Sequence, residues 1–190
     1  MKKVFVAVLL LTGMAGYSQN LTGGLKAGVN VSNFTGGDFG SVNKKALIGF
    51  HAGGFLNLGF GAFSIQPEAM VSTQGAKAED VSGSYDWKLT YITVPIMAKF
   101  KTPGGFYLEA GPQFGFKIDE SIGNQTINDF AKGLDLSIGA GLGFQTVGGF
   151  GIGARYLAGL SKVGDFSGSN IDPDFKNSVI QAGIFYTFGK

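Results

Sequence analysis

The stretch Phe106-Tyr-Leu-Glu-Ala-Gly-Pro-Gln-Phe-Gly-Phe-Lys-Ile118 carries an apolar residue at every second position and a mostly polar or small residue between. Side chains of a β-strand point alternately to opposite faces, so the pattern predicts a strand with one apolar and one polar face. Residues 134–146 repeat it. Each stretch is long enough for a membrane-spanning strand of about 9 to 11 residues.

Six further segments follow the same rule, so we expect eight antiparallel strands in all. These segments are residues 21–32, 46–58, 62–74, 87–101, 150–161 and 178–188. The connections 59–61, 102–105 and 147–149 are short and contain glycine, whereas 33–45, 75–86, 119–132 and 162–177 are long and hold most of the Asp and Glu. Strict alternation of short and long connections is typical of an outer-membrane up-and-down β-barrel, with periplasmic turns and four extracellular loops.

The two faces of these strands decide between a membrane barrel and a soluble one. A soluble lipocalin-like barrel would turn the apolar face inward around a ligand. An eight-stranded barrel has room for little more than packed side chains, and apolar side chains from all eight strands would overfill it. We therefore expect the face rich in glycine and polar residues inside, and the apolar face against lipid.

The N-terminus has the features of an export signal. Lys2 and Lys3 precede an apolar run over residues 4–11, followed by small residues that include Gly16 and Ser18. This pattern predicts a signal peptide over residues 1–18 and a barrel domain over 19–190, placed in the cell outer membrane. The chain has no cysteine, which excludes disulfides and a lipid anchor. Thirteen basic and 13 acidic residues remain after cleavage, so no nucleic-acid partner is expected.

Charges of both signs fall on the predicted inner face. Isolated buried charges are costly, so we expect Glu68, Glu109 and Asp135 to pair with basic residues and form a plug rather than a pore. The expected partners are Lys26, Lys99, Lys117 and Arg155. Paired carboxylates could also perform acid and base chemistry. A structural plug is the favoured interpretation, because these residues lie in no predicted cleft.

Other candidate sites are weaker. His51, the only histidine, lies mid-strand on the inner face, where it suits a hydrogen bond better than a catalytic triad. Acidic residues of the last long connection lack the ligand spacing of a calcium loop. We expect no catalytic, metal or cofactor site.

Three prolines interrupt consecutive strands. Pro67, Pro95 and Pro112 are expected on the lipid-facing phase, several residues from the short turns. Proline removes a ladder donor and in strands marks edges or bulges. The sequence therefore predicts a belt of bulges or missing hydrogen bonds at this depth.

Several short motifs together resemble the PorT-like outer-membrane β-barrel family of Gram-negative bacteria. They are Gly24-Leu-Lys-Ala-Gly-Val-Asn-Val-Ser32, Gln66-Pro-Glu68, Tyr91-Ile-Thr-Val-Pro-Ile96, Tyr107-Leu-Glu-Ala-Gly-Pro-Gln113, Ala154-Arg-Tyr-Leu-Ala-Gly-Leu160 and Phe185-Tyr-Thr-Phe188. The resemblance implies an eight-stranded barrel inserted by the outer-membrane assembly machinery, which recognises a terminal aromatic residue. Here Phe188 is followed by Gly189 and Lys190, a departure from that signal. Founding members are linked to a secretion apparatus, and the family brings no catalytic residues.

These observations favour a non-enzymatic membrane barrel that acts as a structural or interaction protein through its loops. Its expected partners are outer-membrane lipid, the assembly machinery and a protein bound at the loops. The alternatives are a small porin or passive transporter, a secretion-system component, and an outer-membrane enzyme acting on lipid or peptide, for which the sequence places no nucleophile and base.

Overall fold

The computed structural model describes residues 20–36, 43–80, 83–122, 125–126, 133–161 and 175–189. These residues form nine β-strands and no helix. The strands are β1 (Asn20–Gly36), β2 (Asn43–Phe60), β3 (Phe63–Asp80), β4 (Gly83–Lys101), β5 (Phe106–Ile122), β6 (Gln125–Thr126), β7 (Leu134–Gln145), β8 (Phe150–Gly159) and β9 (Phe175–Phe188). In the described part of the chain, no helix is long and apolar enough to cross a membrane.

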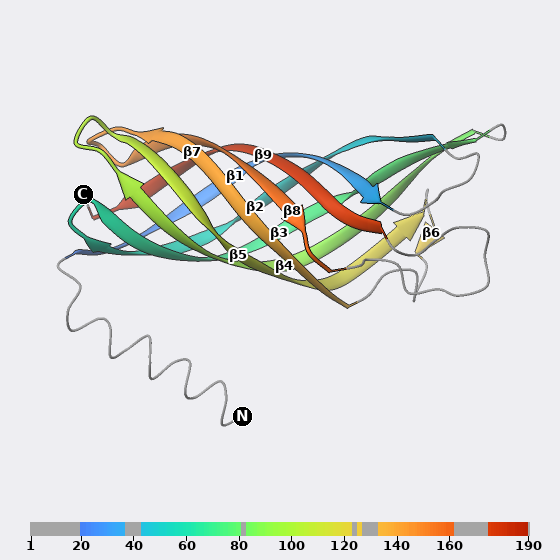
Figure 1. The fold of residues 1–190 in the computed structure, drawn as a ribbon, viewed down its shortest axis with the longest axis horizontal. Coiled ribbons are helices and arrows are strands. Elements are labelled where there is room, and N and C mark those ends of the chain that lie inside the picture. Colours follow the sequence, from blue (N-terminus) through green and yellow to red (C-terminus); the bar gives the residue numbers. More distant parts are fainter. Residues whose placement is uncertain are drawn as a thin grey trace, which may run out of the picture.

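Eight of these strands close into an antiparallel barrel, which confirms the predicted fold. The strand order is β4-β3-β2-β1-β9-β8-β7-β5, and pairing of β4 with β5 completes the ring. The two-residue strand β6 only extends the end of β5, where it pairs with Ser121 and Ile122. β1 begins and β9 ends at the end of the barrel drawn on the left, together with the tight turns (Figure 1). We call this the short-turn end and the opposite end the loop end.

The short turns follow from their sequences. Thr102-Pro-Gly-Gly105 and Thr146-Val-Gly-Gly149 have the same form, and each last glycine adopts a positive φ that other residues rarely accept. In both turns the last glycine N–H donates to the threonine carbonyl, at 3.0 and 3.2 Å. Each threonine hydroxyl donates to the carbonyl of the first residue of the next strand, at 3.1 and 2.9 Å. These contacts fix the register of the hairpins β4–β5 and β7–β8.

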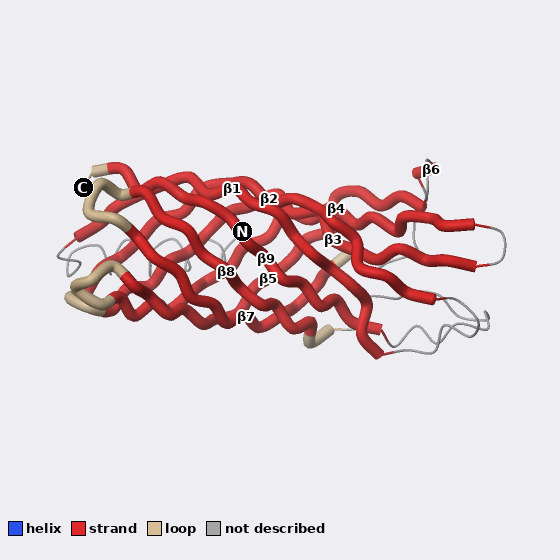
Figure 2. Tube along the Cα trace, turned by 90° about the horizontal axis from the view of Figure 1, so that it is seen from above, coloured by secondary structure: helices blue, strands red, loops and turns tan. Residues whose placement is uncertain are grey.

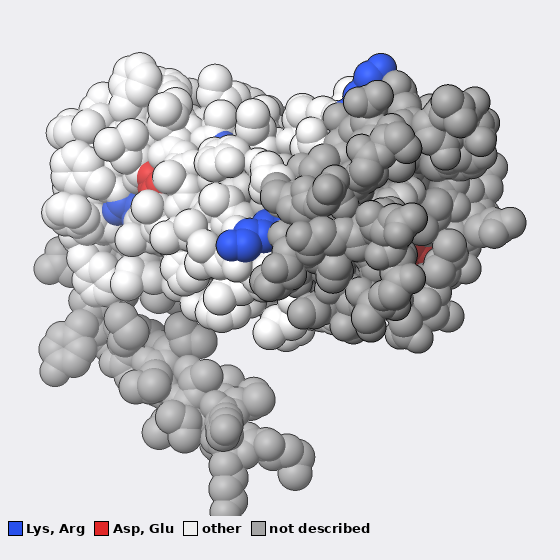
Figure 3. Space-filling view, turned by 45° about the vertical axis from the view of Figure 1, so that its right-hand side comes forward, with Lys and Arg blue, Asp and Glu red and all other residues white. Residues whose placement is uncertain are grey.

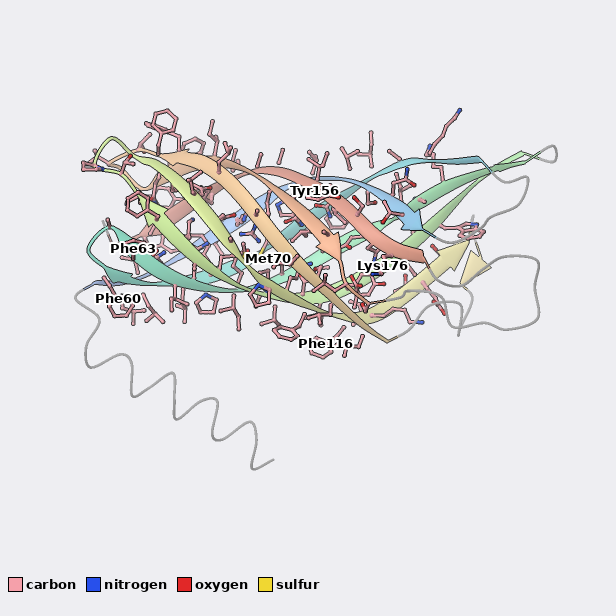
Figure 4. All side chains as sticks on the ribbon, viewed as in Figure 1. Phe60, Phe63, Met70, Phe116, Tyr156 and Lys176 are labelled. Carbon is pink, nitrogen blue, oxygen red and sulfur yellow. The ribbon has the colours of Figure 1, made fainter. Side chains whose placement is uncertain are left out.

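Alternation places bulky apolar side chains on the outside along all eight barrel strands. Leu142 is 60% exposed and Leu108 61% exposed, as expected for residues that face lipid rather than a protein core. The described atoms on the face shown in Figure 3 are mostly uncharged. Nitrogen and oxygen atoms concentrate between the strands, whereas carbon dominates the side chains that project outward (Figure 4). The interior therefore holds the polar phase of each strand.

The strands near the loop end are longer than the sequence indicated. β3 and β4 remain paired to Asp80 and Gly83, so most of the predicted 75–86 loop is a two-stranded extension (Figure 2). The local sequence there mixes lysine, acids and small residues, which hides its strand character, whereas cross-strand pairing supplies the ladder. The predicted signal peptide, and Asp165, Asn170, Asp172 and Asp174 of the last loop, lie outside the described residues.

Candidate functional site

Five charged side chains meet inside the barrel near its middle. They come from five different strands: Lys26 on β1, Glu68 on β3, Lys99 on β4, Glu109 on β5 and Arg155 on β8. Each occupies the inward phase of its strand, which is why closure of the sheet brings together residues far apart in the chain. We call these five residues the ion-pair cluster.

Arg155 is the centre of this cluster. β8 and β3 are opposite one another in the ring, and the Arg155 guanidinium spans the lumen to reach Glu68. Arg155 Nη1 and Nη2 donate to Glu68 Oε2 and Oε1 at 3.0 and 2.7 Å, a bidentate arrangement. Arg155 Nε and Nη2 also lie 2.8 Å from Glu109 Oε1. Its side chain is only 2% exposed, so one guanidinium closes the middle of the lumen.

A glycine lets Arg155 and Glu109 meet. Glu109, Gly141 and Arg155 lie in one cross-strand row on β5, β7 and β8. A Cβ atom on Gly141 would come into close contact with the backbone of Ala154 and with Arg155 itself. The absence of a side chain at the middle position therefore leaves space for the two charged groups to approach across it.

Two lysines complete the cluster. Lys26 Nζ is 3.6 Å from Glu68 Oε1, and Lys99 Nζ is 3.4 Å from Glu109 Oε2. Lys99 Nζ also donates to Gln66 Oε1 at 3.2 Å and lies 3.9 Å from the centroid of the Tyr107 ring, a cation–π distance. Lys99 and Glu109 are direct cross-strand partners, so this contact follows from the register of β4 and β5.

Toward the loop end the interior continues as an uncharged hydrogen-bond network around Asn30. Its amide nitrogen donates to Ser72 Oγ at 3.0 Å and to the Thr73 carbonyl at 2.8 Å. Its oxygen lies 2.7 Å from His51 Nδ1 and accepts from Gln181 at 3.2 Å. His51 is buried and sits in this network as a hydrogen-bonding group.

The remaining two predicted members lie nearer the loop end and have different partners. Lys117 pairs with Glu120 of its own strand, at 2.8 Å. Among the described residues, Asp135 accepts hydrogen bonds from Ser161 Oγ at 3.0 Å and Asn177 Nδ2 at 3.2 Å in place of a cation. The expected pairing of Asp135 with a basic residue is therefore absent from this region, because Arg155 and Lys99 are held by the two glutamates.

One proline differs from expectation in phase, and of the two predicted forms of interruption, bulges or missing hydrogen bonds, the ladders beside the prolines show missing pairs. Pro67 and Pro112 point outward, but Pro95 is buried inside in phase with Lys99, so its predicted lipid-facing position was wrong. At each proline, two consecutive residue pairs are missing between the strand that carries the proline and the strand before it. The register is the same on both sides of each gap. The interruptions are thus gaps in the ladder rather than bulges. Gln66 lies in the gap between β2 and β3, and Glu68 lies in the gap between β3 and β4.

The space left in the lumen is uneven. Beside Arg155 a cavity of about 10 Å³ remains between Lys26, His51 and Gln181, which is room for about one water molecule. On the short-turn side lies a much larger cavity of about 390 Å³, lined by Lys99, Lys101 and the rings of Phe55, Tyr107 and Phe185. The ion-pair cluster thus separates the two halves of the interior.

This geometry holds both glutamates in ion pairs within a closely packed part of the lumen. Both glutamates are held by cations, are almost fully buried and lie beside a space too small for a substrate. No group of three or more His, Asp or Glu residues that could hold a metal occurs in the described ranges. The cluster can cross-link opposite walls of the barrel and block the passage of solutes.

Several interior residues were missed by sequence reasoning. Asn30 and the aromatic cluster of Phe55, Tyr107 and Phe185 all occupy the inward phase, but only charged and some polar residues of that phase were singled out. Counting every second residue from a charged or polar inward-facing residue of the same strand would have identified them. Tyr91 also lies inside, where it is only 1% exposed.

Comparison with solved structures finds barrels of similar size at low sequence identity. Neisserial surface protein A matches with a TM-score of 0.59 and 14% identity, covering 90% of this chain and 100% of the other. The attachment invasion locus protein Ail of Yersinia pestis, in complex with the heparin analogue sucrose octasulfate, matches with a TM-score of 0.55 and 18% identity, at 90% and 100% coverage. At such identities the likeness concerns the fold. No curated protein matches the chain.

Comparison with protein families gives a more specific result. The family described as "Outer membrane protein beta-barrel domain" matches residues 17–165, which is most of the chain and includes strands β1 to β8. The match agrees with the closed eight-stranded barrel, its apolar outer surface and its polar interior. The chain therefore belongs to the outer-membrane protein β-barrel domain family.

Proposed function

We propose that this protein is a non-enzymatic integral outer-membrane protein with a plugged interior, which acts as a structural or partner-binding protein through its loop end. The observation that carries the proposal is the ion-pair cluster, in which Arg155 crosses the lumen to Glu68 and leaves only about 10 Å³ beside it. A barrel closed in this way offers its two ends, not its lumen, for interaction.

The proposal includes the export route and the orientation. The paired lysines and apolar run at the N-terminus support export and cleavage near residue 18. The resemblance to the PorT-like family supports insertion by the outer-membrane assembly machinery. The short turns would then face the periplasm and the long connections the cell exterior. The acidic residues concentrated in those connections supply the chemistry for binding a partner.

Two alternatives differ in what they require of the lumen and the loops. A small porin or passive transporter needs a continuous polar path, which the charged cluster opposes. A role in a secretion apparatus, suggested by the PorT-like motifs, needs a stable protein partner.

Conductance in planar bilayers tests the plug. The wild-type protein should give no large, stable open channel, because the guanidinium and both glutamates occupy the cross-section. Arg155→Ala combined with Glu68→Ala and Glu109→Ala removes these groups, and it should raise conductance if it folds. A large, stable channel through the wild-type monomer would contradict the plugged barrel.

A pull-down from detergent-solubilised outer membranes tests the loops. One variant replaces residues 163–173 and residues 76–85 with tight turns, while the matched control replaces only the short turn 102–105. The proposal predicts a stoichiometric partner that is retained by the wild type and the turn variant and lost by the loop variant. Equal recovery of the partner with the loop variant would place binding elsewhere.

A further inference from the structure

The large cavity at the short-turn end has a different chemistry from the rest of the lumen. Its volume of about 390 Å³ lies within the range of small-molecule sites, roughly 300–1,000 Å³. Hydroxyl and amide groups and two lysines line it, and none of the described residues that line it is acidic. We call this cavity the vestibule; the lining residues that matter here are Asn57, Lys99, Lys101, Gln145 and the rings of Phe55, Tyr107 and Phe185.

The charge balance of the cluster leaves a positive surplus beside the vestibule. Three cations, Lys26, Lys99 and Arg155, share the two carboxylates of Glu68 and Glu109. Arg155 makes the short contacts of 2.7 and 2.8 Å, whereas Lys99 is held more loosely at 3.4 Å. Lys99 lines the vestibule although it is only 8% exposed. Burying an unbalanced charge is unfavourable, so this position favours a counter-anion.

Lys101 adds a second cation on the same wall. Residues i and i+2 of a strand point to the same face about 7 Å apart, so one oxyanion can lie between the two ammonium groups. The Lys101 ammonium donates to Gln145 Oε1 at 3.2 Å, a neutral acceptor that leaves its charge uncompensated by that contact. Asn57 and Gln145 contribute amide groups to the same cavity.

The inner wall of the vestibule is apolar and aromatic. Phe185 forms edge contacts with Phe55 and Tyr107, at centroid distances of 6.0 and 5.9 Å. Glycines make room for these rings, since a Cβ atom on Gly24 or Gly151 would collide with Phe55 or Phe185. A flat apolar group could therefore lie against the rings while its charged end meets the lysines.

From this combination we propose that the vestibule is a binding site for small organic oxyanions, compounds with a carboxylate or phosphate group and an apolar body. The site is independent of the loop end, because it opens at the opposite end of the barrel. In the orientation given above, its ligands come from the periplasm.

Titration in a neutral detergent, followed by amide NMR shifts, tests the site. The probes are benzoate, phenyl phosphate and the neutral benzyl alcohol. Both anions should shift the amides of Lys99, Lys101 and Gln145, and the neutral alcohol should bind at least about tenfold more weakly, since it offers no negative charge to the two lysines. Saturation by benzoate but not phenyl phosphate, or the reverse, would identify the preferred oxyanion within the proposed class.

Lys101→Met is the decisive variant, because Lys101 lies outside the ion-pair cluster and its loss leaves the plug intact. It should weaken benzoate binding about tenfold or more, while the matched control Lys176→Met, near the loop end, should not change it. Equal affinity for benzoate and benzyl alcohol, no shift with any probe, or unchanged affinity in Lys101→Met would each overturn the proposal. None of these outcomes bears on partner binding at the loops.

Discussion

At the residue scale, one guanidinium bridges two buried carboxylates from different walls of the barrel. The planar fork of Arg155 suits this position, because it can donate to Glu68 in a bidentate manner and still reach Glu109 through Nε. A lysine supplies a single compact charge and cannot span both acids in this way. The identity of the residue at position 155 therefore matters more than its charge.

Replacing Arg155 with Met should destabilise the barrel by about 3–5 kcal/mol, because Glu68 and Glu109 would keep only the looser lysine contacts. Urea unfolding in lipid vesicles measures the change. Arg155→Lys is the matched control; it retains the charge and should recover only part of the stability. Unchanged unfolding of Arg155→Met would show that the cluster contributes nothing to stability.

A second residue-scale prediction concerns Gly153. A Cβ atom at this position would collide with the Tyr107 hydroxyl, while its other neighbours lie at 3.4 Å or beyond. Gly153→Ala should therefore cost about 1–3 kcal/mol, the usual range for overpacking. Adding Tyr107→Phe removes the colliding oxygen and should restore most of the loss in the same unfolding assay. An additive double variant would contradict this explanation.

At the scale of the strands, the three prolines interrupt pairing without shifting it. Each gap lies toward the preceding strand, where the proline nitrogen has no hydrogen to donate. The gaps run across β2 to β5, and the second includes Glu68 of the ion-pair cluster. Ion pairs across the lumen therefore act at a depth where three neighbouring ladders are weakened.

Pro112→Ala should restore a donor opposite Ile96 and close the gap between β4 and β5. The expected result is slower hydrogen exchange at the Ile96 amide, which faces β5, measured by NMR in detergent micelles. The interruption beside Pro67 serves as an internal control, because exchange at Leu56 and Asn57 should stay unchanged. Unaltered exchange at Ile96 would mean that the strand geometry, and not the missing donor, opens this ladder.

At the scale of the whole molecule, the barrel reverses the arrangement of a soluble protein. Apolar residues on every barrel strand face outward, and the charged and polar groups are enclosed. Closure gives every barrel strand a paired neighbour on both sides, so the sheet has no free edge. A sheet within a membrane must be closed in this way, because lipid offers no partner for unpaired backbone N–H and C=O groups. The aromatic cluster and the ion-pair cluster divide the enclosed space into a vestibule and a closed middle.

The lipid-facing assignment predicts the effect of a charge on the outer wall. Ile138 lies near the middle of β7 and is 52% exposed. Ile138→Arg should destabilise the folded barrel by roughly 2–4 kcal/mol in bilayers, the cost of arginine near the membrane centre. Ile138→Leu keeps both the apolar surface and the side-chain volume, so it should cost less than about 1.5 kcal/mol. Equal stability of the two variants would be inconsistent with lipid contact at this position.

The sequence by itself determined the strand number, the short-turn positions and most of the face assignment. These features depend on period-two alternation and on short connections that contain glycine, two of them with the sequence Thr-x-Gly-Gly, which are local properties of the chain. Pro95 was wrongly assigned to the lipid-facing side, although it lies four residues before the inward-facing Lys99 and must share its face of the strand. The extension of β3 and β4 beyond residue 75 was missed, because its local composition is that of a loop.

Only the tertiary structure decided which interior groups meet. Arg155 and Glu68 are 87 residues apart and belong to opposite walls, so their contact depends on ring closure and on the stagger between strands. The same closure left Asp135 with Ser161 and Asn177, and it gathered Lys99, Lys101 and three aromatic rings around one cavity. Alternation fixes which side of the wall a residue occupies, whereas its depth and its partners across the lumen are set by the registers of all eight strands together.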